Sequence, residues 1–194
     1  ALTIEPGAVV KFAHEVTHDN DMELWVKGSL QAEGTAQDSV VFTSIRDDAY
    51  GGDTNGDGDS TSAEAGDWNR IRFMSGSSGA LDHAVVRYGG TNVYWDSVQD
   101  RDRSEPVPMI DVTGASPEIT NSVVGSGNAE GIKVASGDST GVSPAVKDSR
   151  IANNGEAGVR VDDAGGTIED NVFAENGTAA SVQYTSSYAG PTAV

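Results

Sequence analysis

A short template that recurs in the second half of the chain constrains the fold more than any other feature of the sequence. In each copy an aliphatic residue stands first, Asn or Asp third, Ser or Asn fourth, and an apolar residue last. Three copies span Ile119–Val124, Val146–Ile151 and Ile168–Phe173, and their starts are 27 and then 22 residues apart. The earlier segment Leu81–Val86 fits the same template. A repeat of this length predicts structural units that stack on one another.

Each copy leads into a polar turn and a second short strand, expected at Ile132–Val134, Val159–Val161 and Val182–Tyr184. Such a repeat is typical of one coil of a parallel β-solenoid, whose inward side chains are buried only by stacking of the coils. Asn suits the corners because it tolerates left-handed backbone conformations, and its amide can pair with the same residue in the next coil. An antiparallel sandwich, with strands about every 8–12 residues, is the alternative fold.

The first half of the chain also shows short strands and no helix signal. No stretch places apolar residues at helical spacing between capping residues. With 24 Gly, no Cys and 6% aromatic residues, the composition is typical of a β protein rich in tight turns. Strands are expected at Leu2–Ile4, Val9–Phe12, Leu24–Val26, Val40–Thr43, Ile71–Phe73 and Val85–Tyr88.

Several segments resemble the right-handed parallel β-helix repeats of secreted and cell-surface proteins of bacteria and archaea. They are Leu2–Phe12, Gly28–Ala36, Val41–Ser44, Gly66–Trp68 and Val86–Gly90. The resemblance implies an all-β, right-handed parallel β-helix with long Asp-rich loop insertions. It implies function only weakly, because the superfamily holds polysaccharide lyases, hydrolases, adhesins and structural modules. We expect one domain over 1–194, with insertions at roughly 46–67 and 91–106 and regular coils over 107–188.

The charge balance excludes some partners. The chain carries 12 Lys and Arg against 30 Asp and Glu, a net charge of −18. Nucleic acid is therefore not expected as a partner, because phosphate binding needs clustered cations. The apolar runs, such as Ala8–Val10, are too short for a transmembrane helix or a signal-peptide core, so we expect no membrane insertion. The β-helix resemblance implies an extracellular or cell-surface location.

The segment Asp53–Glu64 matches the D-x-[DN]-x-[DN]-G-x5-E calcium-loop pattern at every specified position. Calcium takes six to eight oxygen ligands, so the side chains of Asp53, Asn55 and Asp57 are expected to bind it. Asp59 would add a backbone carbonyl and Glu64 a bidentate carboxylate. Strands flank this loop where an EF-hand has helices, which weakens the case for Glu64. Asp47 and Asp48, just upstream, are the second-tier candidates to replace it.

The remaining polar segments are weaker candidates for metal binding. Asp96–Arg103 mixes Asp with Arg, so we expect internal ion pairs there rather than a second cation. His14 and His18 are expected in a solvated polar loop and His83 within a strand, and none has the spacing of a zinc site.

No convergent catalytic site is evident, so we expect the protein not to be an enzyme. A lyase would pair a calcium-bound carboxylate with a basic residue, and Asp82 with Arg70, Arg72 or Arg87 are the candidates. A glycoside hydrolase would need a carboxylate pair, for which Asp162 and Asp163 are available. Nothing in the sequence fixes either set around the calcium loop. Polysaccharide lyase activity is the less favoured hypothesis.

Two kinds of partner remain. The predicted coils reach both ends of the sequence without a polar cap, and bare coil edges favour end-to-end self-association into a filament or stalk. Alternatively, the insertions could form an adhesin-like glycan site with exposed Tyr94 and Trp95. Trp68 directly precedes a strand and is expected to be buried, in the core or under the loop. The function expected from the sequence is therefore a calcium-binding structural protein of the cell surface, with glycan binding as the alternative.

Overall fold

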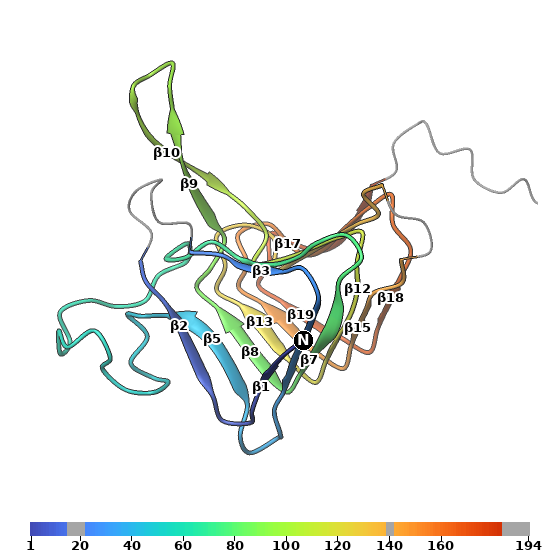
Figure 1. Ribbon diagram of the computed structural model, residues 1–194, viewed down its shortest axis with the longest axis horizontal. Coiled ribbons are helices and arrows are strands. Elements are labelled where there is room, and N and C mark those ends of the chain that lie inside the picture. Colours follow the sequence, from blue (N-terminus) through green and yellow to red (C-terminus); the bar gives the residue numbers. More distant parts are fainter. Residues whose placement is uncertain (15–21, 139–141, 184–194) are drawn as a thin grey trace, which may run out of the picture.

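The computed structural model describes residues 1–14, 22–138 and 142–183, and these residues contain strands and turns but no helix. Three parallel sheets of six strands each make up the body of the protein (Figure 1). Sheet A contains β1 (Leu2–Ile4), β4 (Ser29–Glu33), β7 (Ser78–Asp82), β12 (Ser116–Thr120), β15 (Ala145–Lys147) and β18 (Thr167–Glu169). Sheet B contains β2 (Val9–Phe12), β5 (Val40–Ser44), β8 (Ala84–Arg87), β13 (Val123–Gly125), β16 (Arg150–Ala152) and β19 (Val172–Ala174). Sheet C contains β3 (Leu24–Val26), β6 (Ile71–Phe73), β11 (Ile110–Thr113), β14 (Ile132–Ala135), β17 (Ala157–Asp162) and β20 (Thr178–Gln183).

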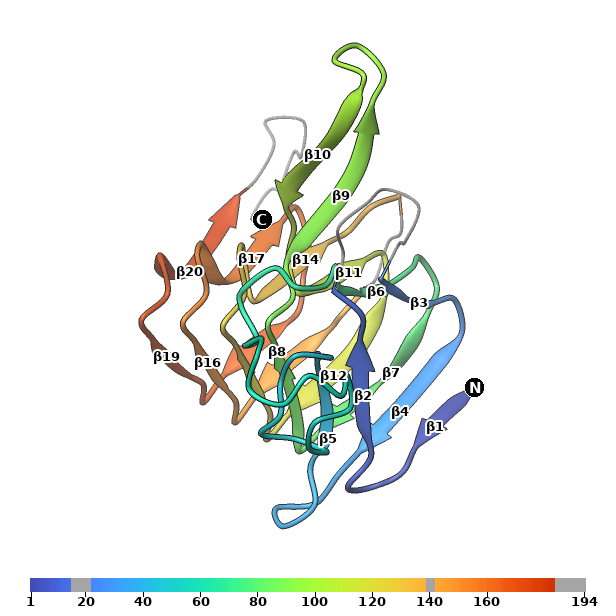
Figure 2. The same cartoon turned by 90° about the vertical axis from the view of Figure 1, so that its left-hand side faces the viewer.

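The chain visits the three sheets in a fixed cycle, from A to B to C and back to A. Each new strand pairs in parallel with the strand of the same sheet one cycle earlier, so the described strands stack along one direction (Figure 2). The all-β class and the parallel sheets agree with the expected architecture. The cycle is interrupted once, after β8, by an antiparallel hairpin of β9 (Thr91–Asp96) and β10 (Arg101–Pro106) that projects from the body.

The recurring template defines the register of the sheets. Its first residue pairs from copy to copy, so that Ile119 lies between Leu81 and Val146 in sheet A. Its last residue does the same in sheet B, where Ile151 lies between Val124 and Phe173. The template therefore contains a corner, and the two apolar ends of each copy belong to different sheets.

The third position of the template is this corner. His83, Asn121, Asp148 and Asp170 all occupy it, with φ between 47° and 56°, in the left-handed region that Asn and Asp tolerate best. The expectation that His83 lies within a strand was wrong, because it lies between β7 and β8 at this corner. The strand expected at Val182–Tyr184 was also misaligned. The template aligns Val182 with Val159, but Val182 pairs with Val161 and Ala180 pairs with Val159. Strand β20 therefore begins at Thr178, earlier than the apolar pattern indicated, and Tyr184 lies outside the described residues.

Buried polar side chains link successive coils at two corners. At the first, the backbone N–H of Ala84 donates to Ser122 Oγ (3.0 Å) and that of Ser122 donates to Ser149 Oγ (3.1 Å). The N–H of Ser149 in turn donates to Asn171 Oδ1 (3.0 Å). These bonds satisfy backbone groups that turn away from the sheets, as buried polar groups require.

The second corner uses asparagine side chains. Asn154 Oδ1 accepts from the N–H of Gly127 (3.2 Å), and Asn154 Nδ2 donates to Asn176 Oδ1 (2.9 Å). Asn176 Nδ2 in turn donates to the carbonyl of Ile151 (2.8 Å). The predicted pairing of Asn residues in adjacent coils is confirmed here.

The core lies between the three sheets and is lined by their inward aliphatic side chains. Its largest fully buried side chains include Trp68, Phe42 and Phe73. The Trp68 ring stacks on Phe12 with centroids 4.1 Å apart, and its Nε1 donates to the carbonyl of Arg87 (2.9 Å). The expected burial of Trp68 is confirmed. None of the described segments forms a helix of the length and apolarity needed to cross a bilayer.

Replacing Asn154 by Ala tests the corner series. Asn154 is 2% exposed, so its loss would leave the N–H of Gly127 without its acceptor and would remove one of the two donors to Asn176 Oδ1. The free energy of unfolding in urea should fall by about 2 kcal/mol. Asn128, an exposed residue whose side chain donates to the half-buried Thr91 hydroxyl, is the control, and N128A should change the free energy of unfolding by less than about 0.5 kcal/mol. Equal losses in the two variants would contradict the assigned role.

Candidate metal centre

Residues 45–70 form a long strand-free loop between β5 and β6, on the side of sheet B (Figure 1). Asp67, 2% exposed, fastens the end of this loop to the core. Its Oδ2 accepts from Ser44 Oγ (2.6 Å) and from the N–H of Glu64 (3.1 Å). Its Oδ1 lies 3.3 Å from Arg46 Nη1 and 3.1 Å from His14 Nδ1. His14 is therefore part of this anchor rather than of a solvated loop, and His18 lies outside the described residues.

Asp47 fastens the beginning of the loop. Its Oδ2 accepts from the buried Thr43 hydroxyl (2.6 Å) and lies 3.7 Å from Arg87 Nε, while its Oδ1 accepts from the N–H of Ala49 (3.3 Å). This second-tier candidate for a metal ligand thus serves to hold the loop. Lys11 holds the middle, because its Nζ donates to the carbonyl of Gly52 (2.5 Å).

Asp53 organises the tip of the loop. Its Oδ1 accepts from the N–H groups of Gly56 (2.7 Å) and Asp57 (3.2 Å), and its Oδ2 from that of Gly58 (2.9 Å). Gly56 and Gly58 have φ of 74° and 64°, which allows the chain to curl around the carboxylate. The Gly58 N–H, supported by those of Gly56 and Asp57, lowers the pKa of the Asp53 carboxyl despite some opposing desolvation. Asp53 therefore stays ionised well into the acidic range.

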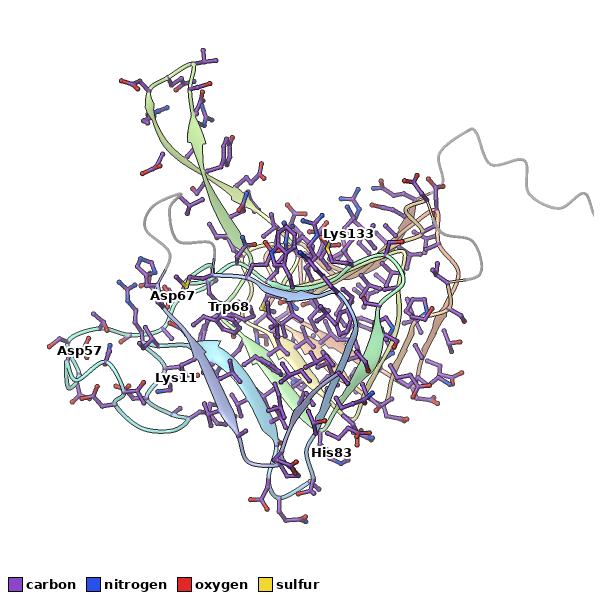
Figure 3. All side chains as sticks on the ribbon, viewed as in Figure 1. Lys11, Asp57, Asp67, Trp68, His83 and Lys133 are labelled. Atoms are coloured by element: carbon purple, nitrogen blue, oxygen red, sulfur yellow. The ribbon has the colours of Figure 1, made fainter. Side chains whose placement is uncertain are left out.

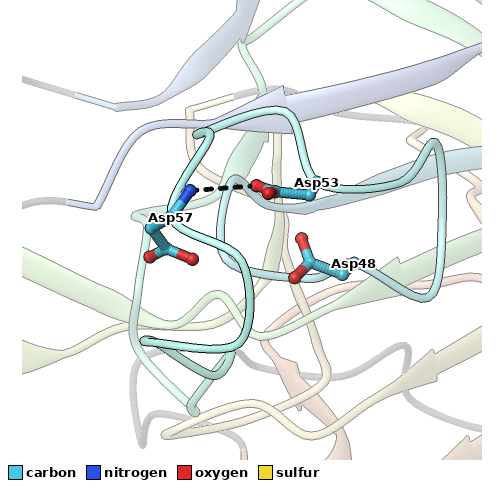
Figure 4. Close-up of side chains that lie close together, drawn as sticks. All are labelled: Asp48, Asp53 and Asp57. Atoms are coloured by element: carbon cyan, nitrogen blue, oxygen red, sulfur yellow. Dashed lines mark hydrogen bonds between the residues drawn. The ribbon is translucent and has the colours of Figure 1, made fainter.

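Three carboxylates meet inside this curl (Figure 4). One oxygen each of Asp48, Asp53 and Asp57 lies within 4.8 Å of the others. Asp48 Oδ1 and Asp57 Oδ1 are shielded from solvent and have no hydrogen-bond partner among the described residues. A buried carboxylate oxygen without a donor is costly unless a cation or a water balances it. The donor set of oxygens alone fits a hard divalent cation.

The remaining predicted ligands lie around this cluster. Asn55 Nδ2 donates to Asp57 Oδ2 (3.0 Å), as does Thr61 Oγ1 (2.5 Å), so these groups orient the Asp57 carboxylate. The carboxylates of Asp59 and Glu64 are not part of the cluster. Asp48, a second-tier candidate, contributes the third carboxylate in place of Glu64. Figure 3 shows Asp57 at the outer part of the loop, far from Asp67 at its base.

The groups considered for catalysis are dispersed over the molecule. Asp82 ends a strand of sheet A, whereas Arg72 lies on β6 of sheet C and Arg70 directly precedes that strand. Both arginines pair with Glu23 and Asp111. Burial opposes ionisation of Asp82, but hydrogen bonds from Asn121, His83 and Thr120 outweigh it and lower the Asp82 pKa. Asp162 is engaged by Arg160 Nε (2.9 Å) and Lys133 Nζ (3.5 Å).

The second insertion is the β9–β10 hairpin. Arg103 Nη1 lies 3.4 Å from Asp96 Oδ2, which confirms the expected internal ion pair. Tyr94, a candidate glycan contact, is 38% exposed on the hairpin, whereas the side chain of Trp95 lies outside what the structure describes.

Comparison with known proteins adds no relative. The sequence matches no family model, and neither a curated protein nor a solved structure shows significant similarity to it.

Replacing Asp67 by Ala tests the anchor of the loop. The change removes a buried acceptor from Ser44 and leaves Arg46 without its carboxylate, so the free energy of unfolding should fall by about 3 kcal/mol. The exposed Asp59 is the matched control, and D59A should be nearly neutral in the same urea titration. A neutral D67A would show that the loop is held by other contacts.

Proposed function

We propose that the protein is a calcium-binding structural module, built as a right-handed parallel β-helix and exposed on a cell surface or secreted. The fixed cycle through three parallel sheets supports the β-helix assignment, together with the sequence resemblance. The observation that carries the calcium assignment is the group formed by Asp48, Asp53 and Asp57, with two carboxylate oxygens that are shielded and unpartnered.

Calcium suits this loop better than magnesium. Magnesium demands near-ideal octahedral geometry, while calcium accepts six to eight oxygens from an irregular, adaptable loop. Asn55 Oδ1 and the carbonyl of Asp59 are further oxygens on the same segment. Without a cation, three carboxylates at this distance repel one another. The ion would therefore order a long loop whose conformational entropy is otherwise expensive to lose.

A structural role fits the arrangement of the ionic groups. The cluster lies on a loop outside the sheets, and the arginines considered as catalytic bases are held in ion pairs elsewhere. No element in the described part of the chain resembles the paired helices that calcium sensors reorient.

Calcium titration of four variants distinguishes the ligand set of the carboxylate cluster from the ligand set of the sequence motif. D48N and D57N should each weaken calcium binding at least about tenfold by isothermal titration calorimetry, since each removes a charged ligand. E64Q and D59N, which remove the same charge outside the cluster, should bind almost as the parent does. In the parent, saturating calcium should raise the melting temperature.

Two results would contradict the assignment. A strong loss in E64Q with none in D48N would place the ion in an EF-hand-like ligand set instead. No calcium-dependent heat or thermal shift in the parent would show that the three carboxylates are simply solvated.

A second candidate function, glycan binding, is favoured by a polar cleft on sheet C at the base of the hairpin. The cleft has a volume of about 380 Å³ and is walled by the Glu105–Pro108 segment. Two carboxylates in it, Asp111 and Glu130, are 6% and 5% exposed and are fixed by arginines. Such oriented donors and acceptors suit the hydroxyl groups of a sugar, and Tyr94 lies on the hairpin that rises from this cleft.

Lys133 lines this cleft, so K133A should reduce binding on a microarray of neutral glycans at least severalfold. Lys147 is a matched control on sheet A, because it too is about one-third exposed and paired with a carboxylate. K147A should leave the signal unchanged. Absence of any glycan signal in the parent, or equal losses in both variants, would exclude this function.

A further inference from the structure

A pocket on the outer face of sheet B is lined by two arginines and by no acidic residue. It has a volume of about 210 Å³, and its lining residues are Tyr50, Val85, Arg87, Val123, Gly125, Ser126, Arg150, Ala152 and Asn153. In a chain with 30 acidic and 12 basic residues, such a lining sets this pocket apart from the clefts described above. It is also separate from the proposed calcium cluster, whose carboxylates are not among its lining residues.

Arg87 is held in place by the groups around it. Its guanidinium lies over the rings of Tyr88 (4.3 Å to the centroid) and Tyr50 (5.7 Å), and it donates to the Tyr88 hydroxyl. Asp47, 3.7 Å from its Nε, balances part of its charge. The side chain is still 28% exposed, so its remaining donors are accessible from the pocket.

Arg150 supplies the unbalanced charge. It is exposed and forms no ion pair or side-chain hydrogen bond within the described part of the chain. Strand β13 lies between β8, which carries Arg87, and β16, which carries Arg150. Val85, Val123 and Arg150 lie opposite one another across these three strands. Two strand spacings, about 10 Å, therefore separate the strands that carry Arg87 and Arg150. The long side chains of two arginines can bridge that span around a small anion.

Apolar side chains lie on the sheet beside Arg150. Val123 is 42% exposed beside Arg150, and Val172, the next residue across the sheet, is 56% exposed. A ligand whose anionic group meets the arginines can cover these valines with an aliphatic part. The net charge of −18 opposes such a ligand at long range, but at physiological salt that field is screened within about 8 Å.

We propose that this pocket binds an organic carboxylate, with the carboxylate group between Arg87 and Arg150 and the aliphatic part over Val123. Arginine recognises a carboxylate through two parallel N–H donors, which gives both affinity and orientation. The side chains of Ser126 and Asn153 are further hydrogen-bonding groups on the rim. The inference goes beyond the proposed calcium function and does not depend on it.

Titration of the ¹⁵N-labelled protein with sodium hexanoate, followed by NMR, tests the proposal in calcium-free buffer. Sodium acetate and sodium chloride at matched ionic strength are the comparison ligands. We expect saturable shifts of signals from Arg87, Arg150 and their neighbours, with hexanoate bound at least about fourfold more tightly than acetate. That factor corresponds to burying one methylene group.

Three variants locate the site. R150Q should weaken hexanoate binding at least about tenfold, because it removes a charged donor pair. R101Q carries the same charge change on the hairpin, where Arg101 bonds only Gln99, and should bind as the parent does. V123S should weaken hexanoate but not acetate.

Shifts that do not saturate, or that chloride reproduces, would overturn the proposal. Equal losses in R150Q and R101Q would show a general charge effect and would also overturn it. Equal affinities for acetate and hexanoate would overturn the assignment of an aliphatic ligand. Repeating the titration with saturating calcium should leave the hexanoate affinity unchanged, so failure of the pocket can be told apart from failure of the proposed calcium site, although Tyr50 of the loop lines the pocket.

Discussion

Every coil of this protein depends on the coils next to it for both its apolar and its polar contacts. The inward side chains are covered only when three sheets close around them, and the backbone of each strand is satisfied by the strand one cycle away. The corners pose the harder problem, since the chain there leaves the ladder of sheet hydrogen bonds. Ser122, Ser149 and Asn171 at one corner, and Asn154 and Asn176 at another, supply the missing acceptors.

The acidic loop over residues 45–70 and the hairpin are placed where this stacking permits additional residues. Both leave the body between one strand and the next without changing the register of the sheets. The loop carries seven carboxylates, yet it is tied down at Asp47 and Asp67 by neutral hydroxyls and by arginines. The carboxylates Asp47 and Asp67 at the base of the loop are therefore paired with hydroxyls and arginines. The carboxylates of Asp48, Asp53 and Asp57 gather at its tip.

The periodic part of the fold was predictable from the sequence because a coil repeats its environment. Positions that point inward in one coil point inward in the next, so Ile119, Val146 and Ile168 are all aliphatic and share one register. The corner at His83 was missed, because His stands where the other copies have Asn or Asp and apolar residues on both sides favoured a continuous strand. The β20 register was missed for a related reason. Ala180, which pairs with Val159, is too small to stand out as a core residue.

The cluster of three carboxylates was predictable in part. The spacing of Asp53 and Asp57 follows from the loop itself, since one carboxylate gathers the N–H groups of the turn that carries the other. The choice between Asp48 and Glu64 depends instead on how the two ends of a 26-residue segment are fastened to sheet B, which the loop sequence does not encode. Arg87 and Arg150 are 63 residues apart in the sequence and become neighbours only through the register of three strands.

The corner series also has a mechanical consequence. Each buried amide or hydroxyl bonds only the coils directly beside its own, so every interface between two coils is held by its own strand pairs and corner bonds. A force applied along the stack must break all bonds of one interface together, whereas a force that lifts the end of the last strand breaks them one after another. The protein should therefore resist stretching along its axis and yield to peeling from an end, one coil at a time.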